Sequence, residues 1–201
     1  AAAVAAGAVT LPAWAQPREG KDYRKLAKPA PVEAPAGKVE VVEFFGYFCP
    51  HCNTFEPTLN AWAKTAPKDI VLHRVPVNFN AKTVPMQKLY YTLEGMGKLE
   101  PLHAQAFRYI HVERKPLQED EQVFAWAKGQ GLDLPKFKEM YNSFGVANQI
   151  RKATQLQQAY DVEGVPSMGV AGRYYVDGTM AGSMENVLRI VEQLAAQVRK
   201  G

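Results

Sequence analysis

Cysteine is nearly absent from this chain, whose 201 residues contain only Cys49 and Cys52. Two cysteines are too few for the disulfide framework that holds many small secreted proteins together, so the pair is predicted to serve chemistry rather than stability. A structural zinc site needs four ligands, and no second cysteine pair exists to supply them. The spacing Cys-x-x-Cys is typical either of redox chemistry or of half a metal site.

The chain also lacks any long run of basic residues. Its formal net charge is +4, and no Lys/Arg run with interleaved aromatic residues occurs, so nucleic-acid binding is not predicted. Hydrophobic residues make up 47% of the sequence and charged residues 22%, a composition that can bury a core and is not typical of disordered chains.

Charge is missing altogether from residues 1–15, which are rich in Ala and Val and end Ala13-Trp14-Ala15. An A-x-A ending after an apolar stretch indicates the remnant of a secretory signal peptide, with a mature chain that starts near Gln16. The segment is too short to span a membrane. A disordered alanine-rich tail is the alternative interpretation.

Hydrophobic periodicity divides the rest of the chain into the order β-α-β, a helical block, one further helix, and β-β-α. Pro76 cannot donate a hydrogen bond to a neighbouring strand, so the second strand is expected at an outer position of the sheet. A glycine-containing loop is expected at 177–182. The predicted strands are 38–45, 70–79, 166–170 and 173–176, and the predicted helices are 50–64, 84–94, 101–112, 119–128, 135–143, 146–160 and 183–200.

The two cysteines lie at the start of the first predicted helix, with Pro50 at its first position, where the missing N–H costs nothing. Free N–H groups and the positive end of the helix dipole favour a thiolate at Cys49, and His51 adds a donor and, when protonated, a charge. A stabilised thiolate makes the Cys49–Cys52 disulfide a stronger oxidant. The alternatives are an inert disulfide and a histidine without a role.

Glu43 interrupts an otherwise apolar predicted strand and shares its alternation with Val41 and Phe45, so it is expected to point into the core. An unpaired buried carboxylate is costly, and such a residue is usually paired or functional. The alternative is an ion pair at the strand edge, and Arg74 on the next strand is a candidate partner.

Three segments carry a family resemblance: the run from Glu43 to Cys52, Gly164-Val165-Pro166-Ser167-Met168, and Val77-Asn78-Phe79. Together they resemble the DsbA family of periplasmic thiol:disulfide oxidases, within the thioredoxin superfamily. The resemblance implies an α/β thioredoxin fold with an inserted α-helical domain. The thioredoxin-like part would comprise 16–79 and 147–201, and the insertion 80–146.

The resemblance also implies an activity, in which the Cys49–Cys52 disulfide oxidises cysteine pairs of exported proteins through a mixed disulfide on Cys49. No cofactor is expected beyond that redox-active disulfide. Val165-Pro166 would be a cis peptide beside Cys49, where Val165, Pro166 and Phe48 contact substrate, and Glu43 would accept a proton near Cys52. Taken without the resemblance, Pro166 is a trans loop proline.

The partners that the resemblance implies are folding exported proteins with free thiols and a membrane quinone reductase of the DsbB type, which reoxidises the pair. A monomeric, periplasmic protein is expected. A disulfide isomerase or reductase of the same fold is the alternative enzyme. The non-enzymatic alternative is a metal carrier that uses Cys49, Cys52 and a methionine or histidine, with Met168 as one candidate. The equilibrium redox potential separates these possibilities.

Overall fold

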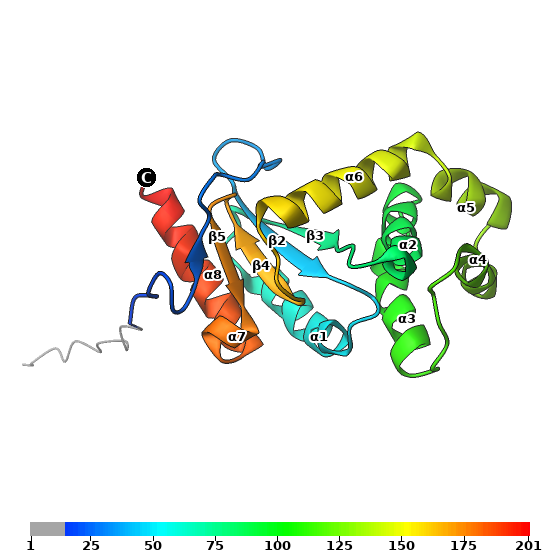
Figure 1. Ribbon diagram of the computed structural model, residues 1–201, viewed down its shortest axis with the longest axis horizontal. Coiled ribbons are helices and arrows are strands. Elements are labelled where there is room, and N and C mark those ends of the chain that lie inside the picture. Colours follow the sequence, from blue (N-terminus) through cyan, green and yellow to red (C-terminus); the bar gives the residue numbers. More distant parts are fainter. Residues whose placement is uncertain (1–14) are drawn as a thin grey trace, which may run out of the picture.

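The computed structural model describes residues 15–201, so the predicted signal remnant lies outside the described residues apart from Ala15. Its centre is a five-stranded sheet in the order β1-β5-β4-β2-β3 (Figure 1). The strands are β1 (Arg24–Lys25), β2 (Val39–Phe45), β3 (Ile70–Pro76), β4 (Ser167–Val170) and β5 (Tyr174–Asp177).

Strand β2 is the strand that positions the cysteines. All seven of its residues are buried, and it pairs parallel to β3 and antiparallel to β4. A parallel pair needs a crossover connection, and helix α1 (Pro50–Thr65) provides it after a four-residue loop that follows β2. β3 has one neighbour in the sheet, so the predicted outer position of the proline-containing strand is confirmed.

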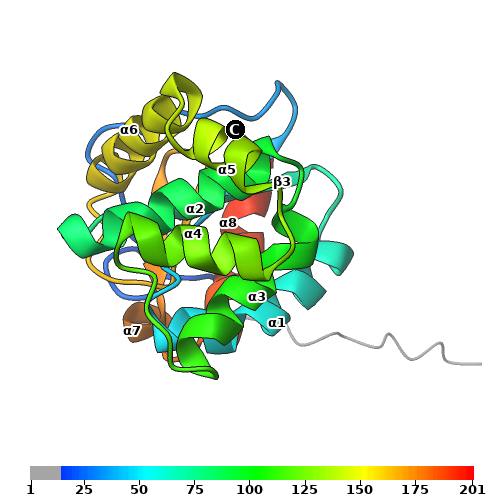
Figure 2. The same ribbon diagram turned by 90° about the vertical axis from the view of Figure 1, so that its right-hand side faces the viewer.

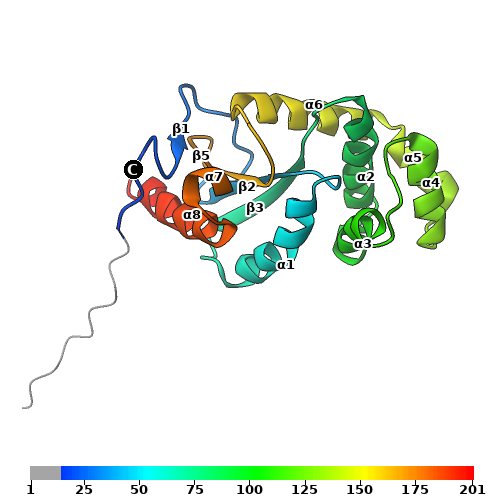
Figure 3. The same ribbon diagram turned by 60° about the horizontal axis from the view of Figure 1, so that its bottom comes forward.

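Helices cover both faces of the sheet (Figure 3). Helices α1 and α8 (Met184–Arg199) lie on one face, where Phe55, Leu59 and the apolar stripe of α8 pack on Val39 and Val41. Helix α6 (Phe144–Ala159) crosses the opposite face. The α8 stripe consists of Val187, Leu188, Ile190, Val191, Leu194 and Ala195.

The remaining long helices gather at one end of the sheet (Figures 1 and 2). They surround an aromatic core that is continuous with the sheet's core through Phe45 and Tyr47. Helix α6 starts in this block and returns to the sheet, so the domain boundary predicted at 146/147 falls within its first turn; the predicted domain limits stay predictions. The block contains η1 (Ala81–Thr83), α2 (Val84–Gly95), α3 (Leu99–His111), α4 (Asp120–Gly129) and α5 (Leu134–Tyr141).

Two local expectations were wrong. The predicted loop at 177–182 contains a short helix, α7 (Gly178–Ala181), because the Asp177 carboxylate accepts a hydrogen bond from the Met180 N–H at 2.9 Å and caps it. The second strand ends at Pro76 rather than at residue 79, because its partner strand β2 ends at Phe45. Within residues 15–201 no helix has the length and apolar character needed to cross a membrane.

Candidate active site

Cys49 caps the N-terminus of helix α1. Its Sγ accepts a hydrogen bond from the backbone N–H of Cys52 at 3.4 Å, while Pro50 and His51 begin the helix at the surface. The hydrogen bond from the Cys52 thiol comes first among the causes that lower the pKa of Cys49. Backbone N–H groups of Cys52 and His51 and the charge of His51 add to it, outweigh burial, and bring the pKa to about 6.

Cys52 lies one turn further into the helix and is fully buried. Burial raises its pKa far above the ordinary value, and the hydrogen bond to Cys49 and the negative charge of Cys49 raise it further. Neither sulfur is in a disulfide, so the geometry is that of the dithiol form. The pair is therefore asymmetric: Cys49 readily becomes a thiolate, and Cys52 stays a thiol.

The loop before β4 brings a distant segment to Cys49. The Val165–Pro166 peptide bond is cis, and the Cys49 thiol lies 3.5 Å from the Val165 carbonyl oxygen, to which it donates a hydrogen bond. These residues are separated by 116 positions in the sequence. The structure thus places Val165 and Pro166 at the cysteine pair, with the cis geometry that the resemblance implied.

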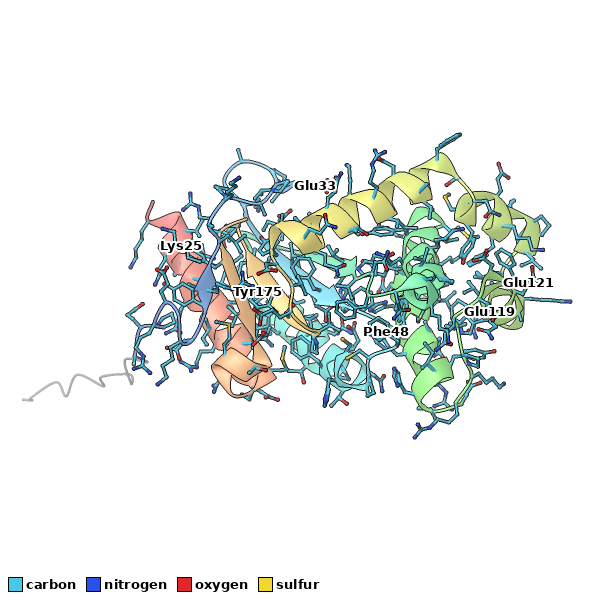
Figure 4. The ribbon with its side chains drawn as sticks, viewed as in Figure 1. Lys25, Glu33, Phe48, Glu119, Glu121 and Tyr175 are labelled. Atoms are coloured by element: carbon cyan, nitrogen blue, oxygen red, sulfur yellow. The ribbon has the colours of Figure 1, made fainter. Side chains whose placement is uncertain are left out.

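Phe48 is half-buried directly before Cys49, and Figure 4 labels it between the sheet and the helical block. Its ring packs edge-on against Phe79, with 5.8 Å between the ring centroids, and Phe79 is 45% exposed. Gly46 makes room for the ring, because a Cβ at that position would lie 2.2 Å from a Phe48 ring carbon. The two rings form an apolar patch beside the reactive sulfur.

Glu43 points into the core and is 1% exposed, in agreement with its alternation on β2. Neither carboxylate oxygen has a hydrogen-bond partner, and the nearest cation is Arg74, whose Nε lies 3.5 Å from Oε1. Burial, followed by the negative charge of Glu56, raises the pKa of Glu43 to about 8. The Glu43 charge in turn raises the pKa of Cys52, so the ionisation of this carboxyl and that of the buried thiol are coupled.

Comparisons with known proteins agree on one family. The model of the DSBA-like thioredoxin domain matches residues 40–191. The chain is 44% identical to the thiol:disulfide interchange protein DsbA of Bordetella pertussis, over 99% of this chain and 95% of the relative. It is 41% identical to DsbA of Pseudomonas aeruginosa, over 90% of this chain and 85% of the relative.

Two solved structures are similar to the whole arrangement. The crystal structure of Pseudomonas aeruginosa DsbA has a TM-score of 0.85 at 40% identity, over 90% of this chain and 94% of that one. That of the oxidoreductase DsbA from Xylella fastidiosa also has a TM-score of 0.85, at 30% identity, over 92% of this chain and 99% of that one.

The chain belongs to the DsbA-like thioredoxin family. The predicted α/β thioredoxin fold with a helical insertion is confirmed. Like its DsbA relatives, the chain is a thiol:disulfide oxidoreductase that acts as a disulfide oxidase, and the isomerase, reductase and metal-carrier alternatives are not favoured.

Beside Glu43 and Arg74, the DsbA fold gathers three polar residues that the sequence pattern did not single out, Glu56, His103 and Tyr47. Arg74 donates from its terminal nitrogen to Glu56 Oε1 at 3.0 Å, and His103 Nε2 faces Glu56 Oε2 at 3.5 Å. His103 Nδ1 lies 2.7 Å from the hydroxyl of Tyr47. Glu56 had a signal in the sequence, because it follows Cys52 by four positions and so shares its helix face.

Proposed function

We propose that the Cys49–Cys52 disulfide oxidises pairs of thiols in exported proteins that are still folding. The observation that carries this proposal is the opposite shift of the two thiols, with the pKa of Cys49 lowered to about 6 and that of Cys52 raised. A low thiol pKa stabilises the reduced form and makes Cys49 a good leaving group. The disulfide therefore gives up its oxidising equivalents readily.

The reaction proceeds in two exchange steps. A substrate thiolate attacks the Cys49 sulfur, the Cys49–Cys52 bond breaks, and its electron pair goes to Cys52, which takes up a proton. A second substrate thiolate then attacks the substrate sulfur of the mixed disulfide, and Cys49 leaves as a thiolate. Two substrate thiols are oxidised to a disulfide, the cysteine pair gains two electrons, and of the two substrate protons one goes to Cys52 and one to solvent.

Glu43 is the group proposed to give Cys52 that proton. With a pKa raised to about 8 it carries a proton at neutral pH, and its charge acts on the buried Cys52 thiol. A carboxyl with a pKa close to the working pH both donates and accepts protons efficiently. In the reverse direction, when the cysteine pair is reoxidised, the same carboxyl takes the proton from Cys52.

Substrate is proposed to bind along the cis-proline loop and the aromatic patch. A peptide bonded to Cys49 lies next to the backbone of Val165, an arrangement suited to an extended segment that pairs through its main chain. Pro166 holds that loop beside the sulfur, and Phe48 with Phe79 offers apolar contact without a shaped pocket. Main-chain pairing together with a shallow apolar patch suits many substrate sequences rather than one.

The proposed partners are thiol-containing exported proteins as substrates and a DsbB-type membrane quinone reductase for reoxidation. The family membership supports both, and the uncharged leader ending Ala13-Trp14-Ala15 supports a periplasmic location. The pair is proposed to work without a further cofactor, in a monomer, and nucleic acid is not among the proposed partners.

The equilibrium redox potential against glutathione tests the proposal. We expect a value clearly more oxidising than the roughly −270 mV of thioredoxin. Cys49→Ser serves as the control, because it cannot form the disulfide and shows which signal belongs to the pair. A potential as reducing as that of thioredoxin would contradict an oxidase.

A further inference from the structure

His103 is a buried histidine of the helical insertion that lies next to Glu56 and Tyr47 of the active-site region. It lies on α3, is 8% exposed, and sits among aromatic rings, with 5.3 Å between its ring centroid and those of both Phe45 and Phe107. A histidine kept only for packing in such surroundings would leave its nitrogens without partners. His103 Nδ1 instead lies within hydrogen-bond distance of the Tyr47 hydroxyl, and Nε2, which makes no hydrogen bond within residues 15–201, faces the Glu56 carboxylate at 3.5 Å.

The partners of His103 determine which nitrogen carries the proton. Burial raises the pKa of Tyr47 well above its ordinary value, so its hydroxyl keeps its hydrogen and can donate it to His103 Nδ1, 2.7 Å away. The carboxylate of Glu56 is an acceptor and faces Nε2 at 3.5 Å. The pattern of donors and acceptors therefore points the Nε2 proton at Glu56.

Glu56 thus lies between the guanidinium of Arg74 and the imidazole of His103. Arg74 reaches its Oε1 at 3.0 Å from one side, and His103 faces Oε2 from the other. Burial acts to raise the pKa of Glu56, but the interaction with His103, followed by the charge of Arg74, outweighs it and leaves the pKa below its ordinary value. Glu43, by contrast, has Arg74 Nε alone, at 3.5 Å.

We propose that His103 is a positioning residue for proton transfer: it holds Glu56 in the ionised form, so that the proton of the buried carboxylate pair stays on Glu43, where Cys52 can use it. The inference rests on the proposed function of Glu43. The helical insertion would then contribute to the redox chemistry itself, in addition to shaping the surface around it.

Titratable side chains surround both His103 and Glu43. The titratable side chains that face His103 are Tyr47 from the loop after β2, Glu56 from α1 and Tyr90 from α2. Those acting on Glu43 are Glu56, Arg74 and Cys49. Of the side chains named as facing His103, Glu56 is the one that acts on Glu43 by its negative charge, and Tyr47 and Tyr90 keep their hydrogens because burial raises the pKa of each.

The test compares His103→Phe, which keeps an aromatic ring in the cluster, with wild type. The measured quantity is the rate constant for reduction of the oxidised protein by dithiothreitol from pH 5 to 9, by acid quench and thiol alkylation. Because ionisation of dithiothreitol is common to both proteins, it cancels in the ratio of their rates. Without His103 the shared proton moves partly to Glu56, so we expect the variant to be slower by about tenfold for each pKa unit by which Glu56 rises above Glu43.

The pH dependence of that ratio decides between the roles. The deficit should be present below pH 8 and shrink above it, where Glu43 has lost its proton in both proteins. A merely structural role would lower the rate by the same factor at every pH. The deficit should also vanish in a Glu43→Gln background, where there is no proton left to misplace.

Two further variants keep the result interpretable. His103→Gln, whose amide N–H can still donate to Glu56, should recover part of the rate and replaces the Phe variant if that fails to fold. His111→Phe is the matched control, because His111 lies on the same helix and contacts the Tyr47 carbonyl at 2.7 Å. A pH-independent ratio, or one that persists in the Glu43→Gln background, would overturn the role of His103. A reducing potential would contradict the oxidase alone.

Discussion

The two ends of strand β2 each bury one glutamate, and they treat it differently. Glu40, at the end remote from the cysteines, is 2% exposed and has partners at Oε1, which accepts the Glu33 N–H at 3.0 Å and pairs with His73 Nδ1 at 3.0 Å. Glu43, at the cysteine end, is 1% exposed and has no hydrogen bond to either oxygen. Burial alone therefore does not distinguish the two residues.

What distinguishes them is the neighbouring strand and helix. Arg74 lies opposite Glu43 in the register of β2 and β3, but its terminal nitrogen donates to Glu56 and Asn60 on α1. The hydrogen bonds of the Arg74 terminal nitrogen thus go to other residues, and the Glu43 carboxyl keeps a proton instead of a charge. A buried polar group without partners lowers the stability of the fold. Here that group is Glu43, the carboxyl proposed to exchange a proton with Cys52.

The largest expected effect is on the stability of Glu43→Gln. The pKa of Glu43 rises from its ordinary 4.5 to about 8 in the folded state, so the folded wild type binds the extra proton and loses stability as the pH rises through that range. The variant should escape this loss and gain on wild type by about 1.4 kcal/mol per pH unit. Urea unfolding of the reduced proteins at pH 5, 6.5 and 8 measures it, and a constant difference would contradict the raised pKa.

Glu40→Gln should instead be less stable than wild type, by a smaller amount that shrinks as the pH rises. The hydrogen bond to Glu40 raises the pKa of His73, so this pair stabilises the fold below the ordinary pKa of histidine and loses its effect as the pH rises through the raised value. His73 is partly exposed, which limits the pair to about 1 kcal/mol or less. The same unfolding series should therefore show the variant below wild type at pH 5 and closer to it at pH 8. A Glu40→Gln variant more stable than wild type would contradict a stabilising role for Glu40, and with it the difference from Glu43.

The sequence pattern was sufficient for the parts of the site that depend on local structure. Cys49 and Cys52 follow from an apolar strand and a proline-started helix, and alternation along β2 predicted that Glu43 points inward. Val165 and Pro166 were predicted only through the family resemblance, because nothing local connects residues 116 positions apart. Their placement beside Cys49 depends on the antiparallel pairing of β2 with β4.

The residues that the sequence did not predict are those that meet across the two parts of the molecule. His103 lies on an amphipathic helix, and helical spacing shows which face is buried but not which domain it is buried against. Its contact with Glu56 exists because α3 docks on α1, a tertiary arrangement that no local pattern encodes. The sequence pattern did not single out Tyr47, whose hydroxyl is the partner of His103.

The smallest expected effect concerns His51, and it tests what makes the cysteine end reactive. Sequence reasoning assigned the low pKa of Cys49 to the helix start and to His51, whereas in the structure the hydrogen bond from the Cys52 thiol comes first and the charge of His51 last. We therefore expect Cys52→Ala to raise the thiolate midpoint of Cys49 from about 6 by more than His51→Ala does, as followed by ultraviolet absorbance of the thiolate against pH.

The shift in His51→Ala should stay below about one pKa unit, which corresponds to at most roughly 30 mV in the redox potential. Glu43→Gln is the matched control for this titration. Glu43 already carries a proton near pH 6, so replacing it with a neutral amide should leave the Cys49 midpoint in place. A larger shift in His51→Ala than in Cys52→Ala would show that the surface histidine, and not the buried thiol, makes Cys49 acidic.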